Sequence, residues 1–155
     1  MKLRIHSVAG RMPSWVDEGV AEYGRRLPRE LQPDWVNLPL GKRTRNVKPI
    51  AVKAEESDRL LQSVRDRDFM VLLDLSGKAW TTEQLARELR EWQLEGRDVS
   101  LVIGGPDGVD DRVRQRADRR WSLSALTLPH PLVRIVLAEQ LYRAWTVNQG
   151  HPYHK

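Results

Sequence analysis

The stretch Val99–Gly108 reads VSLVIGGPDG, and it decides the fold more than any other part of the chain. Its first five residues form a largely apolar run, too short for a helix and typical of a strand buried on both faces. The two glycines that follow leave backbone N–H and C=O groups open to a ligand, because no Cβ covers them. The spacing fits neither the dinucleotide-binding fingerprint nor the P-loop, and Pro106 removes an amide that a phosphate would use. A tight strand-to-helix connection would explain the same residues, so both interpretations stay open.

Segments on both sides of this stretch alternate between strand and helix patterns. Short apolar or alternating runs predict strands, and apolar residues spaced by three and four predict helices. The alternation predicts an α/β fold with a parallel sheet flanked by helices, and 155 residues are enough for one compact domain over 1–155. The expected strands are 3–8, 34–39, 69–73, 99–103 and 121–128, with a turn at 74–77; the expected helices are 14–27, 49–64, one capped by Thr81 or Thr82 and ended by Gly96, and 132–147.

The charge of the chain points to a polyanionic partner. Lys and Arg outnumber Asp and Glu by 26 to 21, which gives a formal charge of +5 and a pI near 9.9. Such a surface attracts polyanions, and nucleic acid is the first partner to consider. The segment Gly41–Lys53 contains five basic residues and no acid, so no neighbour in the sequence neutralises them. We expect a cationic loop that leads into a helix.

The chain contains no cysteine. This excludes a disulfide framework, a thiolate nucleophile and a thiolate zinc site, and it fits a reducing compartment, with the cytoplasm as the expected location. The opening residues Met1–His6 interleave charged and apolar side chains, unlike a secretory signal. No stretch approaches the roughly 18 uncharged apolar residues of a membrane span, so we expect no membrane partner.

Three strand ends are candidate parts of a binding site. Ligands of parallel α/β sheets bind beyond the carboxyl ends of the strands, and Leu73–Asp74, Ile103–Gly105 and Leu126–Leu128 mark such ends. The hydroxyls of Ser122 and Ser124 could hold a flat, uncharged heterocycle such as adenine, although satisfied hydroxyls of a core strand explain them equally well. A serine nucleophile is disfavoured, because neither serine lies in a Gly-x-Ser-x-Gly motif.

The C-terminal region combines an unusually apolar helix with a polar tail. Leu132–Val147 is apolar on nearly every side, more than the roughly 100° stripe that one core covers, so we expect a second face on another copy of the chain. Glu139 and Arg143 form either a solvated ion pair or a buried pair kept for function. The tail His151–Lys155 carries groups suited to proton transfer or phosphate contact, and the alternative is a frayed terminus. Its two histidines lack further ligands nearby, and we expect no metal.

Four motifs resemble one known family in order and spacing: Gly104–Gly108, Ser122–His130, Glu139–Ala144 and His151–His154. Over its whole length the chain resembles the ribosomal large-subunit RNA pseudouridine N3-methyltransferases, which are S-adenosylmethionine enzymes of the SPOUT class. The resemblance implies a homodimer with a C-terminal trefoil knot, which packing rules alone would not suggest. It also implies a pseudouridine substrate in a stem-loop of the large-subunit RNA, recognised in the assembled ribosome. Asp107 stands where the family is expected to have glutamate.

The resemblance implies the residues that contact the cofactor, and the chemistry of methylation at N3 and the charge of the basic loop suggest the other roles. The pseudouridine N3 would attack the sulfonium methyl in line, at about 3 to 3.5 Å. Arg143 would stabilise the imide anion, His154 would act as base or contact a phosphate, and Tyr153 is a further candidate to handle the proton. Lys42, Arg43, Arg45 and Lys48 would hold RNA phosphates. The cofactor S-adenosylmethionine would contact Leu73, Gly104, Leu123, Ser124, Ala125, Leu126, Thr127 and Leu128.

Two other functions stay open at this point. A non-catalytic ribosome-binding or assembly module would explain the charge of +5 and the basic loop, and it predicts no affinity for a methyl donor. A Rossmann-type nucleotide enzyme rests only on the α/β pattern and lacks the glycine fingerprint. Binding of S-adenosylmethionine distinguishes the three functions.

Overall fold

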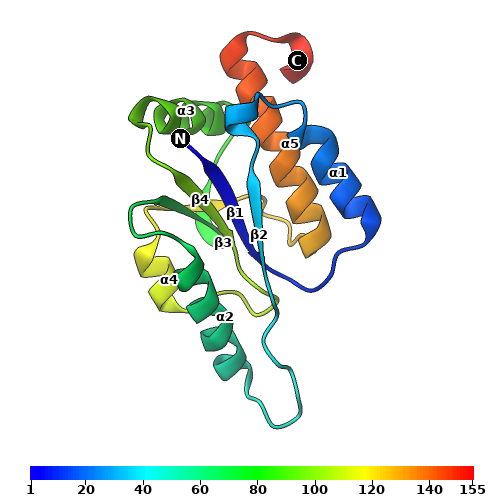
Figure 1. Cartoon of the computed structure of the whole chain (residues 1–155), viewed down its shortest axis with the longest axis vertical. Coiled ribbons are helices and arrows are strands. Elements are labelled where there is room, and N and C mark those ends of the chain that lie inside the picture. The colour runs from blue at the N-terminus through cyan, green and yellow to red at the C-terminus, as the bar shows by residue number, and fades with distance from the viewer.

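The computed structural model describes all 155 residues, and its centre is a sheet of five parallel strands (Figure 1). The expected α/β fold with a parallel sheet is therefore confirmed. The strands β1 (Leu3–Val8) and β4 (Val99–Ile103) lie side by side within the sheet and are buried over their whole length, as the apolar run that begins at Val99 predicts for β4. Across the sheet, the strands are β2 (Asp34–Leu38), β1 (Leu3–Val8), β4 (Val99–Ile103), β3 (Phe69–Ala79) and β5 (Arg119–Ser122).

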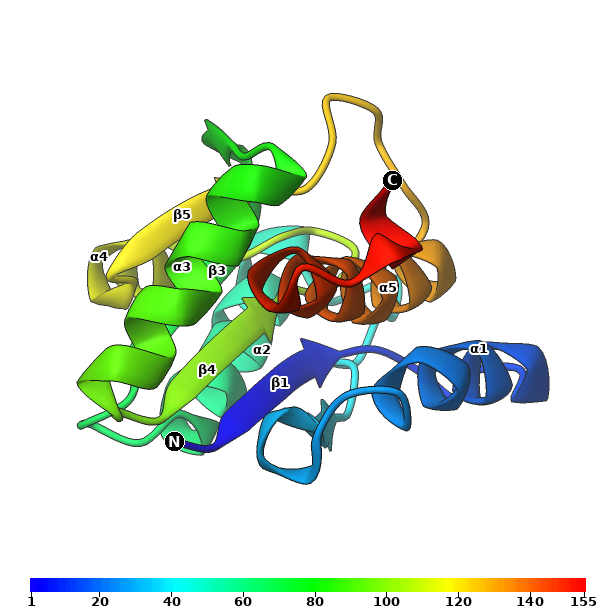
Figure 2. The ribbon, with the colours of Figure 1, turned by 90° about the horizontal axis from the view of Figure 1, so that it is seen from above.

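Helices cover both faces of this sheet. On one face α5 lies between α1 and α3, as Figures 1 and 2 both show. On the other face α2 and α4 pack against the strands. The helices are α1 (Ser14–Gly24), α2 (Pro49–Ser63), α3 (Thr82–Glu95), α4 (Asp111–Arg116) and α5 (His130–Gln149), with short 3-10 turns η1 (Arg29–Leu31) and η2 (Pro152–His154).

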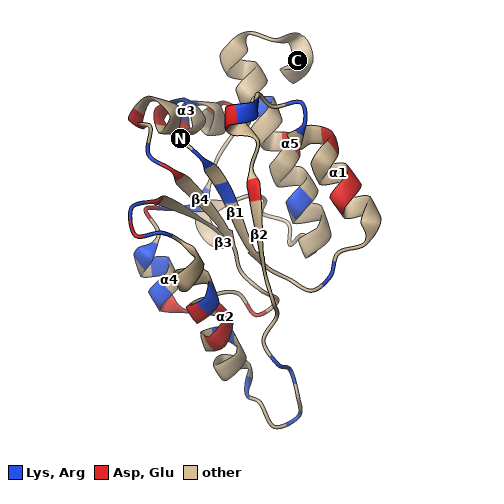
Figure 3. Cartoon of the chain, in the orientation of Figure 1, with Lys and Arg blue, Asp and Glu red and all other residues tan.

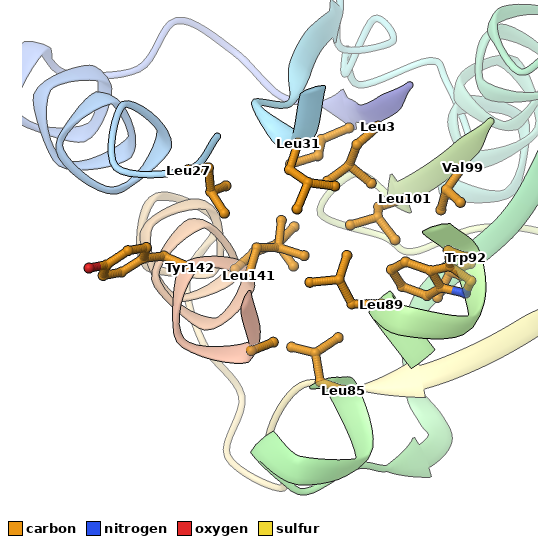
Figure 4. Close-up of a cluster of buried hydrophobic side chains, with 14 of the residues drawn as sticks. Leu3, Leu27, Leu31, Leu85, Leu89, Trp92, Val99, Leu101, Leu141 and Tyr142 are labelled. Atoms are coloured by element: carbon orange, nitrogen blue, oxygen red, sulfur yellow. The ribbon is translucent and has the colours of Figure 1, made fainter. Parts of the chain in front are cut away.

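The period of two along each strand divides the core into two clusters. In β4, Leu101 faces the larger cluster, and its neighbour Val102 faces the smaller one beside α2 and α4. Figure 4 shows the larger cluster, in which Leu89 of α3 and Leu141 of α5 meet Leu3 and Leu101 of the sheet. Alternate side chains of one strand therefore anchor helices on both faces, which holds the carboxyl ends of the strands in fixed positions.

Strand β3 is longer than its sequence pattern indicates. The expected turn at 74–77 is wrong, because β3 continues to Ala79 after a register shift between Leu73 and Lys78 in its pairing with β5. Gly77 permits this pairing: a Cβ on Gly77 would lie only 2.6 Å from the carbonyl carbon of Arg120. The extension depends on contact with a distant strand, which a local pattern does not report.

The expected strand 121–128 is also wrong beyond Ser122. The residues that follow leave the sheet, because short hydrogen bonds within the segment replace the ladder between strands. The Ser122 hydroxyl donates to the Ser124 carbonyl at 3.2 Å, and the Ser124 hydroxyl accepts from the Leu126 N–H at 3.0 Å. These bonds turn residues 123–128 into a loop at the carboxyl edge of the sheet.

One helix is shorter than the sequence predicts, and one helix is not predicted at all. Helix α1 ends at Gly24 rather than Leu27, and Leu27 turns into the core instead. Helix α4 was not expected, although Asp110 supplies a cap by accepting from the Arg112 N–H at 3.0 Å. The capping of α3 by Thr81 and its end at Gly96 are confirmed, the former as a reciprocal capping box with Gln84.

Helix α5 is covered by its own chain more fully than its apolar breadth suggests. Helices α1 and α3 flank α5, and the sheet covers a further side of it. Leu132 in its first turn remains 43% exposed. The apolar pattern by itself is therefore weaker evidence for a second subunit than the sequence alone indicates.

Candidate functional site

The carboxyl end of β4, the middle of β3 at Leu73 and Leu75, and the loop 123–128 enclose a small cavity of about 130 Å³. Its lining is mostly apolar, with the hydroxyls of Ser124 and Thr127 as polar groups. Leu126 also lines the cavity, but it lies at the edge and is 72% exposed. The structure brings together six of the residues expected to contact the cofactor: Leu73, Leu123, Ser124, Leu126, Thr127 and Leu128.

A wider cleft of about 680 Å³ adjoins this cavity and shares Leu75, Ile103, Leu128 and Val133 with it. The whole turn Gly104–Gly108 lines the cleft, and Gly104 follows the carboxyl end of β4 directly, as the sequence predicts. Ala125 is the exception, because it lines neither the cavity nor the cleft. Together the two spaces form an apolar slot that opens into a wider chamber, where apolar residues are joined by a few charged ones such as Asp74 and Asp107. Sites for small ligands are commonly lined in this way, by apolar groups with a few polar ones.

The chamber contains a fixed carboxylate. Asp74 accepts hydrogen bonds from Arg114 Nε at 3.1 Å and from Arg120 Nη2 at 3.2 Å. Although partial burial alone would raise it, the hydrogen bonds from Ser76 and Arg114 hold the pKa of Asp74 below its ordinary value. Asp74 therefore carries a negative charge at neutral pH, at the rim where a cationic group of a ligand could lie.

Glu56 of α2 packs against the glycine turn at Gly105. The sequence analysis does not identify this residue. Its side chain is 1% exposed and accepts from the Gly41 N–H at 2.9 Å and from both terminal nitrogens of Arg43 at 3.0 Å. A Cβ on Gly105 would lie 2.6 Å from Glu56 Oε1, so a side chain at this position would displace the Glu56 carboxylate. Arg43 also reaches Asp107 at 3.2 Å, which joins the basic loop to the glycine turn.

The basic loop extends beyond the carboxyl edge of the sheet, between β2 and α2 (Figures 1 and 3). Lys42, Arg45 and Lys48 are exposed there and form no ion pair. Arg43 differs from them, because its guanidinium is turned inward to Glu56 and Asp107. Three of the four residues expected to hold phosphates are therefore open to a polyanion, and the fourth anchors the loop.

The expected catalytic residues Arg143 and Tyr153 meet around Glu139. Arg143 Nε donates to Glu139 Oε1 at 2.8 Å, the Tyr153 hydroxyl donates to the same oxygen at 3.2 Å, and the guanidinium lies 5.0 Å from the Tyr153 ring centre. The bond to Glu139 raises the pKa of Arg143, and burial together with Glu139 raises the pKa of Tyr153. The tail is ordered as η2, and His154 Nδ1 is buried in it without a hydrogen-bond partner.

This tail cluster and the cavity beside the loop 123–128 lie at opposite ends of α5. Val133 lines the cavity in the first turn, and Arg143 follows ten residues later, about 15 Å further along the helix axis. Figure 1 shows the C-terminal tail at the end of the molecule away from the carboxyl edge of the sheet. Within one chain, the structure does not bring Arg143, Tyr153 and His154 to the cavity.

The fold defines an α/β protein of the parallel-sheet class, and its cavity lies at the edge of the sheet where such proteins bind ligands. A family model described as "Predicted SPOUT methyltransferase" matches residues 1–154, and the chain belongs to this family of methyltransferases.

Curated relatives are similar over the full length. The chain is 48% identical over 155 residues, covering 100% of it and 99% of the relative, to "Ribosomal RNA large subunit methyltransferase H" of Hahella chejuensis. Proteins of the same name from Saccharophagus degradans and Pseudomonas putida are 50% and 51% identical over 155 residues, each with 100% of both chains covered. None of the helices described above combines the length and the apolar character that crossing a membrane requires.

Proposed function

We propose that the protein is an S-adenosylmethionine-dependent methyltransferase, and that its substrate is N3 of a pseudouridine in large-subunit ribosomal RNA of the assembled ribosome. The observation that carries the proposal is the cavity between β3, the carboxyl end of β4 and the loop that follows β5, formed largely by the residues expected to contact the cofactor. The printed name of the full-length relatives supports the RNA substrate. All of these elements belong to one domain over residues 1–155, and a ribosomal substrate places the reaction in the cytoplasm.

The residues at the cavity fit this cofactor. Leu73, Leu123 and Leu128 provide an apolar slot for an adenine ring, and the Thr127 hydroxyl, which forms no hydrogen bond within the chain, is free to contact it. The backbone of Gly104 borders the adjoining chamber, where Asp74 is fixed as a carboxylate. When bound, S-adenosylmethionine supplies an electrophilic methyl group on a sulfonium sulfur. The task of the protein is then alignment and charge stabilisation rather than covalent catalysis.

The tail cluster supplies the groups that methylation at an imide nitrogen requires. The N3 proton must leave, and a cation beside the ring favours the resulting anion. Arg143 is that cation, held in place by Glu139. His154 accepts the N3 proton or contacts a phosphate of the RNA. Tyr153, oriented by Glu139, lies beside the pseudouridine base.

A homodimer resolves the separation of the two parts of the site. Because α5 holds the cavity at one end and the tail cluster at the other, the tail of a second copy is needed to close the cavity. The exposed Leu126 and Leu132 beside the cavity provide apolar surface for that contact. We also propose the trefoil knot of the resembled family: the chain leaves β5 at one edge of the sheet, passes through 123–128 and returns as α5 against α1.

The basic loop contributes binding rather than chemistry. Lys42, Arg45 and Lys48 hold RNA phosphates at the carboxyl edge of the sheet, and Arg43 keeps the loop attached to the glycine turn. A non-catalytic ribosome-binding module is not favoured, because the family and the relatives are methyltransferases. A Rossmann-type enzyme is not favoured for the same reason.

Calorimetry with S-adenosylmethionine tests the proposal. We expect one binding site per chain in the wild type and loss of binding in Leu128→Asp, which places a charge in the apolar slot. The matched control is Leu94→Asp, because Leu94 is 74% exposed on α3. Failure of the folded wild type to bind the compound, or equal binding by Leu128→Asp, would contradict the proposal.

A further inference from the structure

Arg134 is a buried cation that the methyl-transfer site does not use. It lies in the second turn of α5, is 5% exposed and forms no ion pair with a carboxylate. Its Nη2 donates to the Ser7 hydroxyl at 2.9 Å and to Asn37 Oδ1 at 2.7 Å, and its Nε is buried without a partner. Both partners are neutral, so the charge of the guanidinium is left uncompensated.

A buried and uncompensated charge costs stability, and proteins retain such charges where a ligand or a partner completes them. Burial lowers the pKa of Arg134, and the negative charge of Asp17 opposes that effect from beyond ion-pair distance. The guanidinium also lies over the ring of Trp35 at 5.3 Å, which fixes its plane. The side chain is therefore held in place with hydrogen-bonding capacity to spare.

Arg134 borders a polar cleft of about 520 Å³ at the start of α1. Helix α1 has 11 residues, and its N-cap is Pro13, which offers no side-chain hydrogen bond to the first turn. The N–H groups of Ser14 and Trp15 donate to no group of the chain, whereas that of Val16 donates to the Pro13 carbonyl at 3.0 Å. The two free N–H groups and the helix dipole favour an anion. The cleft is lined by both cations Arg11 and Arg134, by the polar side chains of Ser14 and Asn37, and by one acid, Asp17.

We propose that this cleft binds one phosphate group of the RNA substrate, held by Arg134 and the first-turn amides of α1. The proposal rests on the proposed function and adds a subsite to it. Arg134 fits the task because its planar guanidinium presents several N–H donors to phosphate oxygens. The opposing charge of Asp17 weakens the site without neutralising it, since no ion pair joins the two side chains.

The cleft lies next to the proposed cofactor chamber. The two spaces share Ala9, Gly10 and Met12 of the β1–α1 connection. The Ser7 hydroxyl joins them, because it hydrogen-bonds to Arg134 on one side and to His130 Nε2, at 2.8 Å, on the other. His130 lines the chamber, so a phosphate at Arg134 would be fixed two side chains away from the methyl donor. This subsite would register the RNA backbone against the reacting base.

Binding to ribosomes that lack the modification, measured by co-sedimentation over a range of KCl concentrations, tests the subsite. Arg134→Gln removes a charge-assisted contact, so the Kd for ribosomes rises about tenfold. The slope of log Kd against log salt falls by about 0.7, as for one lost phosphate contact. Asp17→Asn lowers the Kd, because it removes the opposing charge. The matched control Arg90→Gln loses the same charge from an exposed position on α3 and changes the Kd less than twofold.

Protein stability separates this role from a purely structural one. Arg134→Gln keeps or raises the midpoint of thermal unfolding, since an uncompensated buried charge is removed, and its affinity for S-adenosylmethionine stays within twofold of the wild type. If Arg134→Gln does not fold, Arg11→Gln at the rim of the cleft carries the same test of ribosome binding. Millimolar inorganic phosphate should weaken ribosome binding by the wild type and not by Arg134→Gln.

Three results would overturn the subsite. One is that Arg134→Gln and Arg11→Gln keep the Kd for ribosomes and the salt slope of the wild type, while the wild type still methylates ribosomes. Another is weaker ribosome binding in Asp17→Asn. The third is binding of free phosphate at Arg134 with no effect on ribosome binding, which would make the cleft a site for small anions. Failure of the proposed function looks different, because the wild type itself would then neither bind S-adenosylmethionine nor transfer methyl groups.

Discussion

Replacing Glu56 with glutamine tests how the basic loop and the glycine turn are held together. The Glu56 carboxylate accepts three hydrogen bonds, one from the Gly41 N–H and two from Arg43, and it is 1% exposed. Glutamine has nearly the same shape but only one acceptor oxygen, so one nitrogen of Arg43 then faces an NH₂ group, donor against donor. Glu56→Gln loses at least one charge-assisted bond, which contributes about 1.5 to 3 kcal/mol.

We expect the free energy of unfolding to fall by about 2 to 3 kcal/mol, allowing for the partial exposure of Arg43. For a chain of this length that corresponds to a decrease in Tm of about 4 to 12 °C. Glu55→Gln is the matched control: Glu55 is the preceding residue of α2, is 46% exposed and pairs with Arg59 at 2.6 Å. Its effect should stay below about 1 kcal/mol, as for surface ion pairs.

Urea unfolding followed by tryptophan fluorescence measures both variants. Because Gly105 lies against Glu56, calorimetry should also show weaker binding of S-adenosylmethionine in Glu56→Gln and not in Glu55→Gln. Equal losses of unfolding free energy in the two variants would refute the reasoning. They would show that the buried Glu56 carboxylate contributes no more to stability than the exposed Glu55 carboxylate.

Three further predictions concern the tail cluster and the first turn of α5. Arg143→Ala should abolish methyl transfer to ribosomes and change S-adenosylmethionine affinity no more than a few-fold, as measured by turnover and calorimetry; unaltered turnover would remove Arg143 from the mechanism. Deletion of residues 151–155 should leave a folded dimer by sedimentation but no activity, whereas full activity would show that η2 lies outside the site. Burial and Arg134 lower the pKa of His130 to about 4, so the unfolded chain takes up the proton first as the pH falls. The unfolding free energy that His130 contributes is complete above pH 6.5 and declines by about 2 kcal/mol towards pH 4. Urea titrations of wild type and His130→Asn at pH 7 and pH 4 should differ by that amount, and identical pH dependences would contradict it.

Elements with strong local signals could be predicted from the sequence. The apolar run at Val99–Ile103 predicts β4, and Thr81 and Gly96 predict the two ends of α3. Features that depend on distant contacts could not be predicted. β3 continues past Leu73 because it pairs with β5, and Gly77 permits that pairing through a close backbone approach. The loop after Ser122 follows from hydrogen bonds that compete with the strand ladder, despite a strand-like composition.

The candidate site shows the same division. The rule for parallel sheets brings Leu73, Gly104 and the loop 123–128 to one edge, and the structure places a cavity there. The function of Glu56 was not predictable, because it depends on how Gly105 approaches α2 in space. The distance between the tail and the cavity could have been estimated, since the expected helix Leu132–Val147 is long enough to separate its ends by about 20 Å.

If the cavity beside the loop 123–128 binds a methyl donor, the protein transfers that methyl group to ribosomal RNA. The most direct test is mass mapping of large-subunit RNA from cells that lack the gene, before and after incubation of their ribosomes with the purified protein and isotopically labelled S-adenosylmethionine. We predict one labelled methyl group at N3 of a single pseudouridine with the wild type, and none with Leu128→Asp. An unchanged RNA mass with folded wild-type protein, or a methyl group at another position, would contradict the account.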